Sequence, residues 1–392
     1  MISIDEALTR VLALAHAPQP EDIAIADAAG RALHAPVTAR LTQPPFDAAA
    51  MDGYALRQAD IAQPLRVIGE SAAGHPWQGK AVPGTAIRIF TGAAVPPGYD
   101  RVVMQENTTR DGDLLMVTDP SGGPHIRPSG NDFAEGDGFD PQRPLTPADI
   151  GLLAAMNIPK VSVARRPRVA ILATGDELLP PGTTPAPGQI ICSNDIVIAA
   201  LARAAGAEAQ VLPIAGDTES SLRDSFARAA GADLLVTIGG ASVGDHDLVG
   251  GVAESLGMRR AFYKIAMRPG KPLMAGSIDT SVMLGLPGNP VSSIVCAILF
   301  MQPLILRMQG LPGATPIRKA RLAQDLPSEG PRQHYLRATL TEGDDLPLIH
   351  PFGDQDSARM ALMSGADALL IRPANDGVRK TGEIIEFIPL RP

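Results

Sequence analysis

The spacing of hydrophobic and polar positions divides the chain into regions of different predicted structure. Up to the turn at Gly30, apolar residues recur at helical spacing. From residue 37 to residue 137 the pattern changes to short β-like runs such as "LRVIGE" and "TAIRIF", separated by Gly, Pro and Asp. Residues 146–165 return to a helix and a strand, which we expect to pack against the N-terminal helix. The pattern therefore predicts an α+β domain of residues 1–36 and 138–165, with a β-rich domain of residues 37–137 inserted in it.

From Arg166 onward, apolar strand-like runs alternate with helical segments. The strand-like runs are "RVAILAT", "AQVLPIAG", "DLLVTIGG" and "SVMLGL". Repeated strand–helix units predict a parallel sheet with helices on both faces, so residues 166–311 are expected to form a three-layer α/β domain. After Pro312 the runs "HYLRATLTE", "DALLIRPA" and "GEIIEFIPL" predict a barrel-like β domain of residues 312–392. The predicted fold class is a multidomain α/β protein.

Composition and charge exclude several classes of partner. The net charge of −8 disfavours nucleic acid and anionic membranes, and an aromatic content of 4% disfavours a stacking platform for single strands. Cys192 and Cys296 are the only cysteines, which fits a reducing cytosol. Asp5 and Glu6 stand where a signal peptide would be positive. The most apolar segment, "VSSIVCAILFMQPLIL", is broken by Pro303 and is predicted to be too short to span a bilayer.

Four polar loops follow apolar strands of the predicted α/β sheet. Their sequences are "TGDE" at 174–177, "GDT" at 216–218, "GGASVGDHD" at 239–247 and "PGNP" at 287–290. Ligands of doubly wound sheets bind beyond the carboxyl ends of the strands. The four loops are therefore predicted to form one binding site, although each loop alone is also typical of an ordinary turn or helix start.

The loop at 239–247 combines glycines with two carboxylates. Gly239 and Gly240 allow backbone N–H groups to approach a phosphate, and a simple strand-to-helix turn is the alternative. Asp245 and Asp247 at a separation of ~5 Å would repel each other by about 3 kcal/mol. They would be stable there if solvated or if they share a cation such as Mg²⁺, and the alternative for each is an N-cap of the following helix.

A helix start and a group of cations follow further along the chain. In "PGNPVSS", Asn289 is a predicted N-cap and Pro290 is the first residue of a long helix. The free N–H groups of that first turn suit an anion, and a well-made helix start is the alternative. "YKIAMRPGKP" brings Lys264, Arg268 and Lys271 near one another, either as a local anion trap or as a solvated edge.

Taken together, these segments resemble the molybdopterin molybdenumtransferase family, whose eukaryotic relatives include the E domain of gephyrin. The resemblance covers essentially the whole chain, and its carriers are "MDGYA" (51–55), "FTGAAVPPGYD" (90–100), "IRPSGNDF" (126–133), "ATGDEL" (173–178), "GDT" (216–218), "GGASVGDHD" (239–247), "KIAMRPGKP" (264–272) and "LPGNPVSS" (286–293). It implies an elongated homodimer of four domains around a molybdopterin-binding-like α/β domain, with an active site completed by the partner subunit. It also implies a cytoplasmic enzyme that inserts its substrate molybdate into adenylylated molybdopterin, releasing AMP, with Mg²⁺ as cofactor.

The resemblance also assigns functional residues by position. By residue type alone, Asp52 and Thr91 are interpreted as turn residues. The implied catalytic residues are Asp52, Thr91, Glu177, Asp217 and Asp247, and the last three are the implied Mg²⁺ ligands. The implied substrate-binding residues are Asp132, Gly239, Gly240, Ser242, Gly244, Asp245, Lys264, Arg268, Lys271, Pro287, Gly288, Asn289 and Pro290. Among these, the three cations would neutralise phosphate or molybdate oxygens.

The sequence departs from the family pattern at four positions. Arg268 stands where a lysine is common, which keeps the charge and changes the geometry. Cys192 stands where many members have an aspartate. Ala361 and Leu362 stand where many members have paired serines, so a hydroxyl contact from these positions to molybdate is not expected.

Two other functions compete with the enzyme. A peptide-binding scaffold of the gephyrin type would use the same fold, but the full set of acids and bases argues against a purely structural role. A nucleotide pyrophosphatase of the competence-damage type would share the α/β domain, but the β-rich segment around "MDGYA" argues against it. The resemblance leaves open transient contacts with a molybdopterin adenylyltransferase or with molybdoenzyme chaperones.

Overall fold

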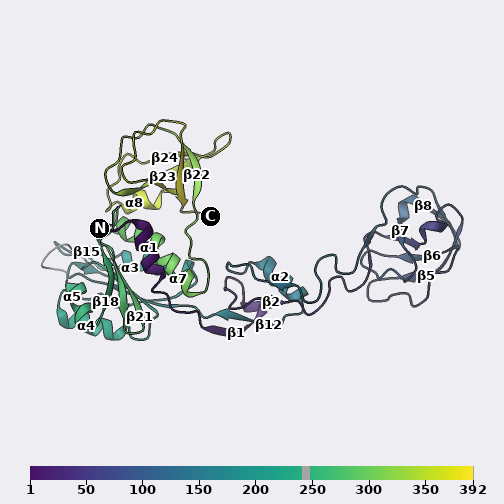
Figure 1. Ribbon diagram of the computed structural model, residues 1–392, viewed down its shortest axis with the longest axis horizontal. Helices are drawn as coiled ribbons and strands as arrows, with labels where there is room; N and C mark the ends of the chain where they lie inside the picture. The colour runs from purple at the N-terminus through teal and green to yellow at the C-terminus, as the bar shows by residue number, and fades with distance from the viewer. Residues whose placement is uncertain (241–247, 392) are drawn as a thin grey trace. The chain divides into compact units, whose positions relative to one another are not determined.

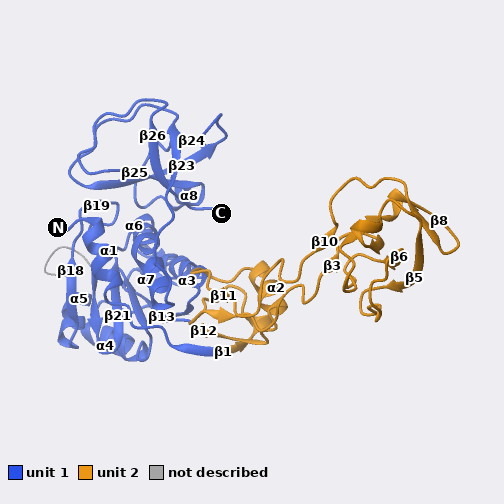
Figure 2. Ribbon diagram, turned by 45° about the vertical axis from the view of Figure 1, so that its right-hand side comes forward, with its two compact units in different colours: residues 1–21, 164–392 blue, residues 22–163 orange. Residues whose placement is uncertain are grey.

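The computed structural model describes residues 1–240 and 248–391, which divide into two compact units (Figure 2). Unit 1 comprises Met1–Glu21 and Ala164–Pro392, and unit 2 comprises Asp22–Val163. Each unit is described by itself below. The division into four domains at the boundaries given above stays a prediction.

Unit 1 contains a six-stranded sheet. Its strands, in spatial order, are β16 (Glu208–Val211), β13 (Arg168–Ala173), β17 (Leu234–Ile238), β21 (Ser281–Leu286), β20 (Met274–Ile278) and β18 (Arg259–Tyr263). The first four are parallel, as predicted, whereas β20 pairs antiparallel with both β21 and β18. The sheet is therefore mixed. β20 and β21 form a hairpin with Asp279 at φ 48°, a conformation that Asp tolerates in a two-residue turn.

Helices cover both faces of this sheet (Figure 1). The helices are α1 (Ile4–Leu12), α3 (Asn194–Ala204), α4 (Glu219–Arg228), α5 (Leu248–Ser255), α6 (Pro290–Cys296) and α7 (Gln302–Met308). Buried residues of α4 and α5 share one core with the sheet, and those of α1, α3, α6 and α7 share the core on its other face. This confirms the three-layer α/β arrangement.

The prediction that the N-terminal helix packs against the helix near residue 147 was wrong. Ile4, Ala7 and Val11 of α1 are buried in the core of the α/β sheet. Helix α2 (Pro147–Ala155) instead packs in a separate core within unit 2. An apolar stripe determines which face of a helix is buried, but it does not determine which surface covers that face.

The longest helical segment runs from Pro290 to Met308 and contains a π-helical turn, η4 (Ala297–Met301), between α6 and α7. Pro303 follows that turn, and because proline lacks an N–H group, the regular hydrogen-bond ladder is interrupted there. By length and composition this helix could cross a membrane, so the prediction that it is too short was wrong. However, 83% of its apolar window is buried inside the molecule, which is typical of a core helix.

The C-terminal part of unit 1 is a closed β-barrel, as predicted. Its strands are β22 (Arg318–Leu322), β23 (Gln333–Thr341), β24 (Leu348–Pro351), β25 (Ala368–Arg372) and β26 (Ile384–Pro389). The order β23-β24-β22-β26-β25 closes because β25 also pairs with β23. The short strand β19 (Met267–Arg268) is not one of the five barrel strands and pairs in parallel with the start of β23. Helix α8 (Met360–Ser364) lies between β24 and β25 in the chain. Apolar residues of all five barrel strands form one core.

Unit 2 is β-rich, with a six-stranded sheet in the order β7-β4-β6-β5-β9-β8. Its strands are β4 (Gly53–Leu56), β5 (Leu65–Ser71), β6 (Thr85–Ile89), β7 (Arg101–Met104), β8 (Thr108–Asp111) and β9 (Leu114–Val117). The remaining short elements are β1 (Pro20–Ala24), η1 (Ile25–Asp27), β2 (Val37–Thr38), β3 (Ala48–Ala49), η2 (Gln58–Asp60), η3 (Gln105–Asn107), β10 (Ile126–Arg127), β11 (Gly138–Phe139) and β12 (Lys160–Ala164). Unit 2 thus places the "MDGYA" and "FTGAA" segments at the ends of β4 and β6.

Candidate functional site

A cavity of about 990 Å³ lies at the carboxyl edge of the parallel strands and is called the sheet-edge cavity here. Its lining includes the predicted residues Glu177, Asp217, Gly239, Gly240, Pro287, Gly288, Asn289 and Pro290. β14 (Leu178–Leu179) and β15 (Ile190–Ile191), a two-stranded parallel sheet, also border it. The fold therefore brings together the described residues of the four polar loops, as expected from the topology of the sheet.

The two acidic loops of this cavity hold each other in place. The backbone N–H of Asp217 donates to Asp176 Oδ1 at 3.0 Å, and the N–H of Asp176 donates to Asp217 Oδ2 at 3.4 Å. Glu177 folds over Gly175, whose φ of 150° is a conformation that favours glycine. As a result, the carboxylates of Glu177 and Asp217 line the same cavity.

These oxygen ligands suit Mg²⁺, which prefers carboxylates in combination with substrate phosphates and water. Within residues 1–240 and 248–391, no three Asp, Glu, His or Cys side chains are grouped as a complete ligand set. Glu177 and Asp217 therefore fit a Mg²⁺ ion that takes its other ligands from a phosphate and water. The predicted ligand Asp247 lies outside the described residues, as do Ser242, Gly244 and Asp245.

The end of β17 requires two glycines. Gly239 and Gly240 have φ values of 90° and 65°, and a Cβ atom on Gly240 would lie 2.3 Å from Val249 Cγ2. Beside them, Thr174 is 4% exposed, and its hydroxyl has no hydrogen-bond partner in the described chain. Thr174 was not predicted as a site residue, although it is the first residue of the "TGDE" loop.

The "PGNP" loop ties the α/β sheet to the C-terminal barrel. Asn289 is the N-cap residue and Pro290 the first residue of α6, as predicted. The Asn289 side chain makes no capping hydrogen bond to the helix, and its Nδ2 donates to Ser357 Oγ at 3.1 Å. Asn194 Nδ2 donates to the Gly288 carbonyl at 2.7 Å. The loop is thus held from two sides.

A second cavity, of about 980 Å³, lies between the "RPGKP" segment and the barrel and is called the barrel cavity here. Its basic lining residues are Arg268, Lys271, Arg332, His334 and Arg372. Pro272 and Ser292 line both cavities, which places the two side by side. The acids of the barrel cavity already have partners. Asp325 pairs with Lys380 at 2.8 Å, and Asp354 pairs with Arg359.

Not every predicted cation reaches this site. Arg268 and Lys271 line the barrel cavity, whereas Lys264 lines neither of the two cavities as described. Lys264 has φ 68°, and its Nζ lies 4.8 Å from the centre of the Tyr263 ring. Arg332, His334 and Arg372 were missed. Two basic residues two positions apart in "PRQHYLR", at the start of a predicted strand, were the signal that could have indicated Arg332 and His334.

The departures from the family pattern have different consequences. Cys192 is buried at the wall of the sheet-edge cavity, where burial raises the pKa of its thiol to about 11, so it stays neutral. Ala361 and Leu362 lie on α8 and are not among the described lining of the barrel cavity. Ser292 and Ser357 do line that cavity.

In unit 2, Asp52 and Thr91 form a pair. Asp52 Oδ1 accepts hydrogen bonds from the Thr91 N–H at 2.7 Å and from Thr91 Oγ1 at 2.8 Å. These two bonds hold the pKa of the exposed Asp52 carboxyl below its usual range. Asp132 lies in a different loop, where its N–H donates to the Gln43 carbonyl at 3.0 Å.

The α/β sheet with its edge cavity defines the class of the protein: residues 170–307 match the family described as a probable molybdopterin binding domain. Residues 2–157 match the family described as the MoeA N-terminal region (domain I and II), and residues 319–390 match the MoeA C-terminal region (domain IV). The chain belongs to the MoeA family of molybdenum cofactor biosynthesis.

Individual relatives support this assignment along most of the chain. The molybdopterin molybdenumtransferase of Nostoc sp. is 37% identical over 377 residues, which cover 92% of this chain and 86% of the relative. That of Haemophilus influenzae is 38% identical over 317 residues, which cover 79% of this chain and 78% of the relative. A crystal structure of the MoeA protein of Pyrococcus horikoshii matches with a TM-score of 0.84 and 30% identity, covering 100% of both chains.

These findings confirm the resemblance, the fold class and the assignment to an enzyme family of molybdenum cofactor biosynthesis. The scaffold and pyrophosphatase alternatives are not favoured, because the relatives that match over most of the chain are named as transferases.

Proposed function

We propose that this chain is a cytoplasmic, homodimeric molybdopterin molybdenumtransferase that inserts molybdate into adenylylated molybdopterin and releases AMP with Mg²⁺ as cofactor. The observation that supports this best is the adjacency of two unlike cavities. The sheet-edge cavity offers glycines, carboxylates and a helix start to a phosphate-bearing nucleotide, and the barrel cavity offers cations to a tetrahedral oxyanion. Pro272 and Ser292 border both, so the two substrates could meet there.

The chemistry needs positioning and charge stabilisation rather than a protein nucleophile. A molybdate oxygen attacks the pterin-side phosphorus of the anhydride, the bond from that phosphorus to the AMP oxygen breaks, and AMP leaves. The two dithiolene sulfurs then bind the metal, the bridging oxygen stays on the pterin phosphate, and one oxo ligand leaves as water with the two thiol protons. Glu177 and Asp217 would hold Mg²⁺, and the bound ion would neutralise negative charge on the phosphates. Arg268 and Lys271 would bind the oxyanion and orient it toward the anhydride. The neutral thiols of Cys192 and Cys296 need take no part.

A second subunit is proposed to complete the site. Ile190 and Ile191, at the rim of the sheet-edge cavity, are 56% and 37% exposed, and Ile196 on the first turn of α3 is 52% exposed. An exposed apolar group beside a polar cavity is typical of a surface that another chain covers. The proposed contribution of the partner subunit is a second copy of the Asp52–Thr91 pair.

AMP release from adenylylated molybdopterin by the purified chain with Mg²⁺, with and without molybdate, tests the proposed reaction. Release that depends on molybdate is the expected result. Release without molybdate would support a pyrophosphatase, and tight pterin binding without release would support a scaffold. Omission of Mg²⁺ is expected to abolish release, and sedimentation of the chain is expected to show a dimer.

We expect Lys271→Ala to weaken binding of molybdate by about 10- to 100-fold, because Lys271 lines the barrel cavity and the loss of a charge-assisted hydrogen bond costs roughly 1.5–3 kcal/mol. Added salt should weaken wild-type binding in the same direction. Titration calorimetry at two ionic strengths measures both effects. Lys319→Ala removes an exposed lysine of β22 outside both cavities and serves as the control. A dissociation constant that is insensitive to salt would refute the role of the cations.

A further inference from the structure

Three basic side chains form a row across neighbouring strands at one edge of the barrel cavity. Arg268 of β19 is directly opposite His334 of β23, and His334 is directly opposite Arg372 of β25. Residues opposed in this way project to the same side of a sheet, with Cβ atoms roughly 4.5–5.5 Å apart. All three line the barrel cavity. Three positive charges at this spacing would repel one another. Asp376 and Glu329 offset part of this repulsion, and a neutral member of the row or a bound anion would offset the rest.

The outer members of the row are permanently charged. Arg372 is 0% exposed, and its Nε donates to Asp376 Oδ2 at 2.6 Å. Its Nη2 donates to the carbonyls of Pro327 at 2.9 Å and Gly377 at 2.8 Å. Its Nη1 is buried without a partner among the described residues. The guanidinium is therefore fixed in position with one donor unsatisfied, which is costly unless a further group enters the site.

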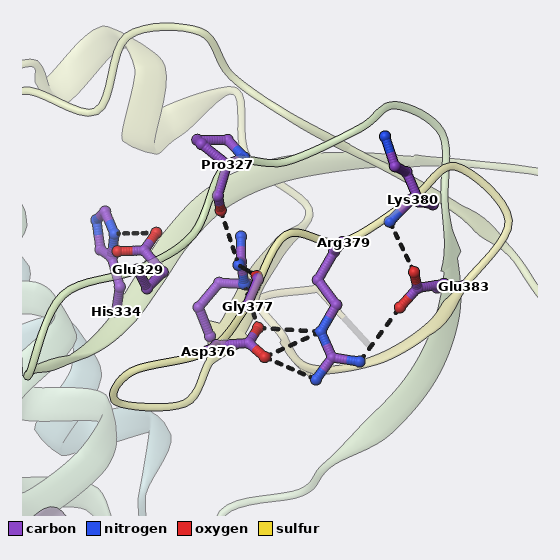
Figure 3. A network of polar contacts seen from close by, with 9 residues as sticks. Pro327, Glu329, His334, Asp376, Gly377, Arg379, Lys380 and Glu383 are labelled. Atoms are coloured by element: carbon purple, nitrogen blue, oxygen red, sulfur yellow. Dashed lines mark hydrogen bonds and ion pairs between the residues drawn. The ribbon is translucent and has the colours of Figure 1, made fainter.

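The middle member, His334, can change its charge. It is 5% exposed, and its Nδ1 lies 3.0 Å from Glu329 Oε1 (Figure 3). The charged groups that face it are Glu329 from the preceding loop, Arg268 from β19 and Arg372 from β25. Burial lowers the pKa of His334, Glu329 opposes that effect, and the two arginines reinforce it, so the pKa lies below its usual value. With Nδ1–H donating to Glu329, neutral His334 keeps a lone pair on Nε2.

We infer that His334 is a positioning residue that takes up one proton when a tetrahedral dianion enters the barrel cavity. The inference rests on the proposed function, in which that dianion is molybdate. The proton passes from solvent to Nε2, and no bond of the oxyanion is broken. The resulting Nε2–H donates to an oxyanion oxygen, while Nδ1–H remains on Glu329. Without the proton, His334 Nε2 would present a lone pair to the anion. With the proton it donates a hydrogen bond, and the anion compensates the positive charge that His334 adds to those of Arg268 and Arg372.

The expected signature is a dependence of molybdate affinity on pH. The free protein has a His334 pKa below the usual value of about 6.5, and the bound dianion raises it. Between these two pKa values the apparent Kd should rise about tenfold per pH unit, because each binding event takes up one proton. Below the pKa of the free protein and above that of the complex, the Kd should be independent of pH.

Titration calorimetry of the full chain with sodium molybdate, near neutral pH in two buffers of different ionisation enthalpy, counts the protons taken up. We expect an uptake approaching one proton for the wild type and none for His334→Gln, in which the amide can still donate to Glu329. His350→Gln is the matched control, since His350 lies in the same barrel and its Nε2 lies 3.0 Å from Thr341 Oγ1 rather than in the cavity. That variant should retain the proton uptake.

Two results would overturn the inference while the proposed function stands: binding of molybdate without proton uptake by the wild type, or an unchanged uptake by His334→Gln. Absence of molybdate binding to the wild type would overturn both the inference and the proposed role of the barrel cavity. If His334→Gln does not fold, NMR titration of the wild-type imidazoles with and without molybdate decides the matter. A histidine pKa that rises on binding supports the inference, and histidine pKa values that do not change refute it.

Discussion

Replacement of Asp376 by alanine is expected to destabilise the C-terminal barrel by about 3–5 kcal/mol, the usual cost of removing one partner of a buried ion pair. Asp376 Oδ2 accepts from Arg372 Nε at 2.6 Å. Asp376 Oδ1 accepts from Arg379 Nη2 at 2.8 Å (Figure 3). The Asp376 side chain is 7% exposed and that of Arg372 is 0% exposed. Without Asp376, Arg372 would keep only two carbonyl partners for a fully buried charge. Urea unfolding followed by a probe in the barrel measures the loss.

The chain provides a matched control for this prediction in Asp345→Ala. Asp345 also receives two hydrogen bonds from one arginine, at 2.8 Å and 2.7 Å from Arg321, but it is 58% exposed. Exposed pairs contribute little, so its removal should barely move the unfolding midpoint. Equal effects of the two substitutions would show that burial is not what makes the Asp376 pair important.

The Asp376 pair also predicts how acid affects the barrel. Burial raises the pKa of Asp376, but hydrogen bonds from Arg379 and Arg372 outweigh it and lower the pKa below its usual range. A carboxyl with a lowered pKa in the folded state contributes stability that is fully present above its unfolded pKa of about 3.9 and is lost as the pH falls toward the folded value. Asp376→Ala should lack this part of the acid-induced destabilisation.

The strands that the sequence predicted and those that it missed differ in how they are buried. β13, β17 and β21 are nearly continuous apolar runs because helices cover both of their faces, so their patterns are distinctive. β18 begins with two exposed arginines, and β20 contains Gly276. Their place in the sheet depends on antiparallel pairing through the hairpin at Asp279, which local spacing does not indicate.

The candidate site could likewise be predicted only where local sequence patterns determine the position of a residue. Its loops could be placed at one edge of a sheet because parallel strands end together, and Glu177 and Asp217 do line one cavity. The row of Arg268, His334 and Arg372 could not be predicted, because its members come together through two long-range pairings, β19 with β23 and β23 with β25. Closure pairs β23 with β25, which are separated by two other elements in the chain.

Asp52→Ala is expected to lower molybdate-dependent AMP release by roughly 100-fold or more, the usual scale for losing one preorganised electrostatic group in an active site. The fold should be retained, because Asp52 is exposed, its side chain accepts two hydrogen bonds from Thr91, and the backbone bond from the Gln105 N–H to the Asp52 carbonyl remains in the variant. Its carboxylate stays ionised at neutral pH, since those bonds lower its pKa. Initial rates of AMP release, together with circular dichroism, measure the two effects separately.

The control for Asp52→Ala must remove a similar hydrogen-bonded carboxylate from a turn outside the proposed site. Asp119→Ala meets this requirement. Asp119 is also an exposed carboxyl of unit 2, and its Oδ1 accepts from the Ser121 N–H at 2.8 Å. Hydrogen bonds from Ser121 likewise lower its pKa. If turnover depends on the charge at Asp52 and not merely on an ordered turn, Asp119→Ala should keep full activity.

Asp52→Asn should then be nearly as inactive as Asp52→Ala, because the asparagine side chain keeps a hydrogen-bond acceptor and removes the negative charge. Normal turnover in both Asp52 variants would show that this position, despite its match to the family pattern, has only a structural role.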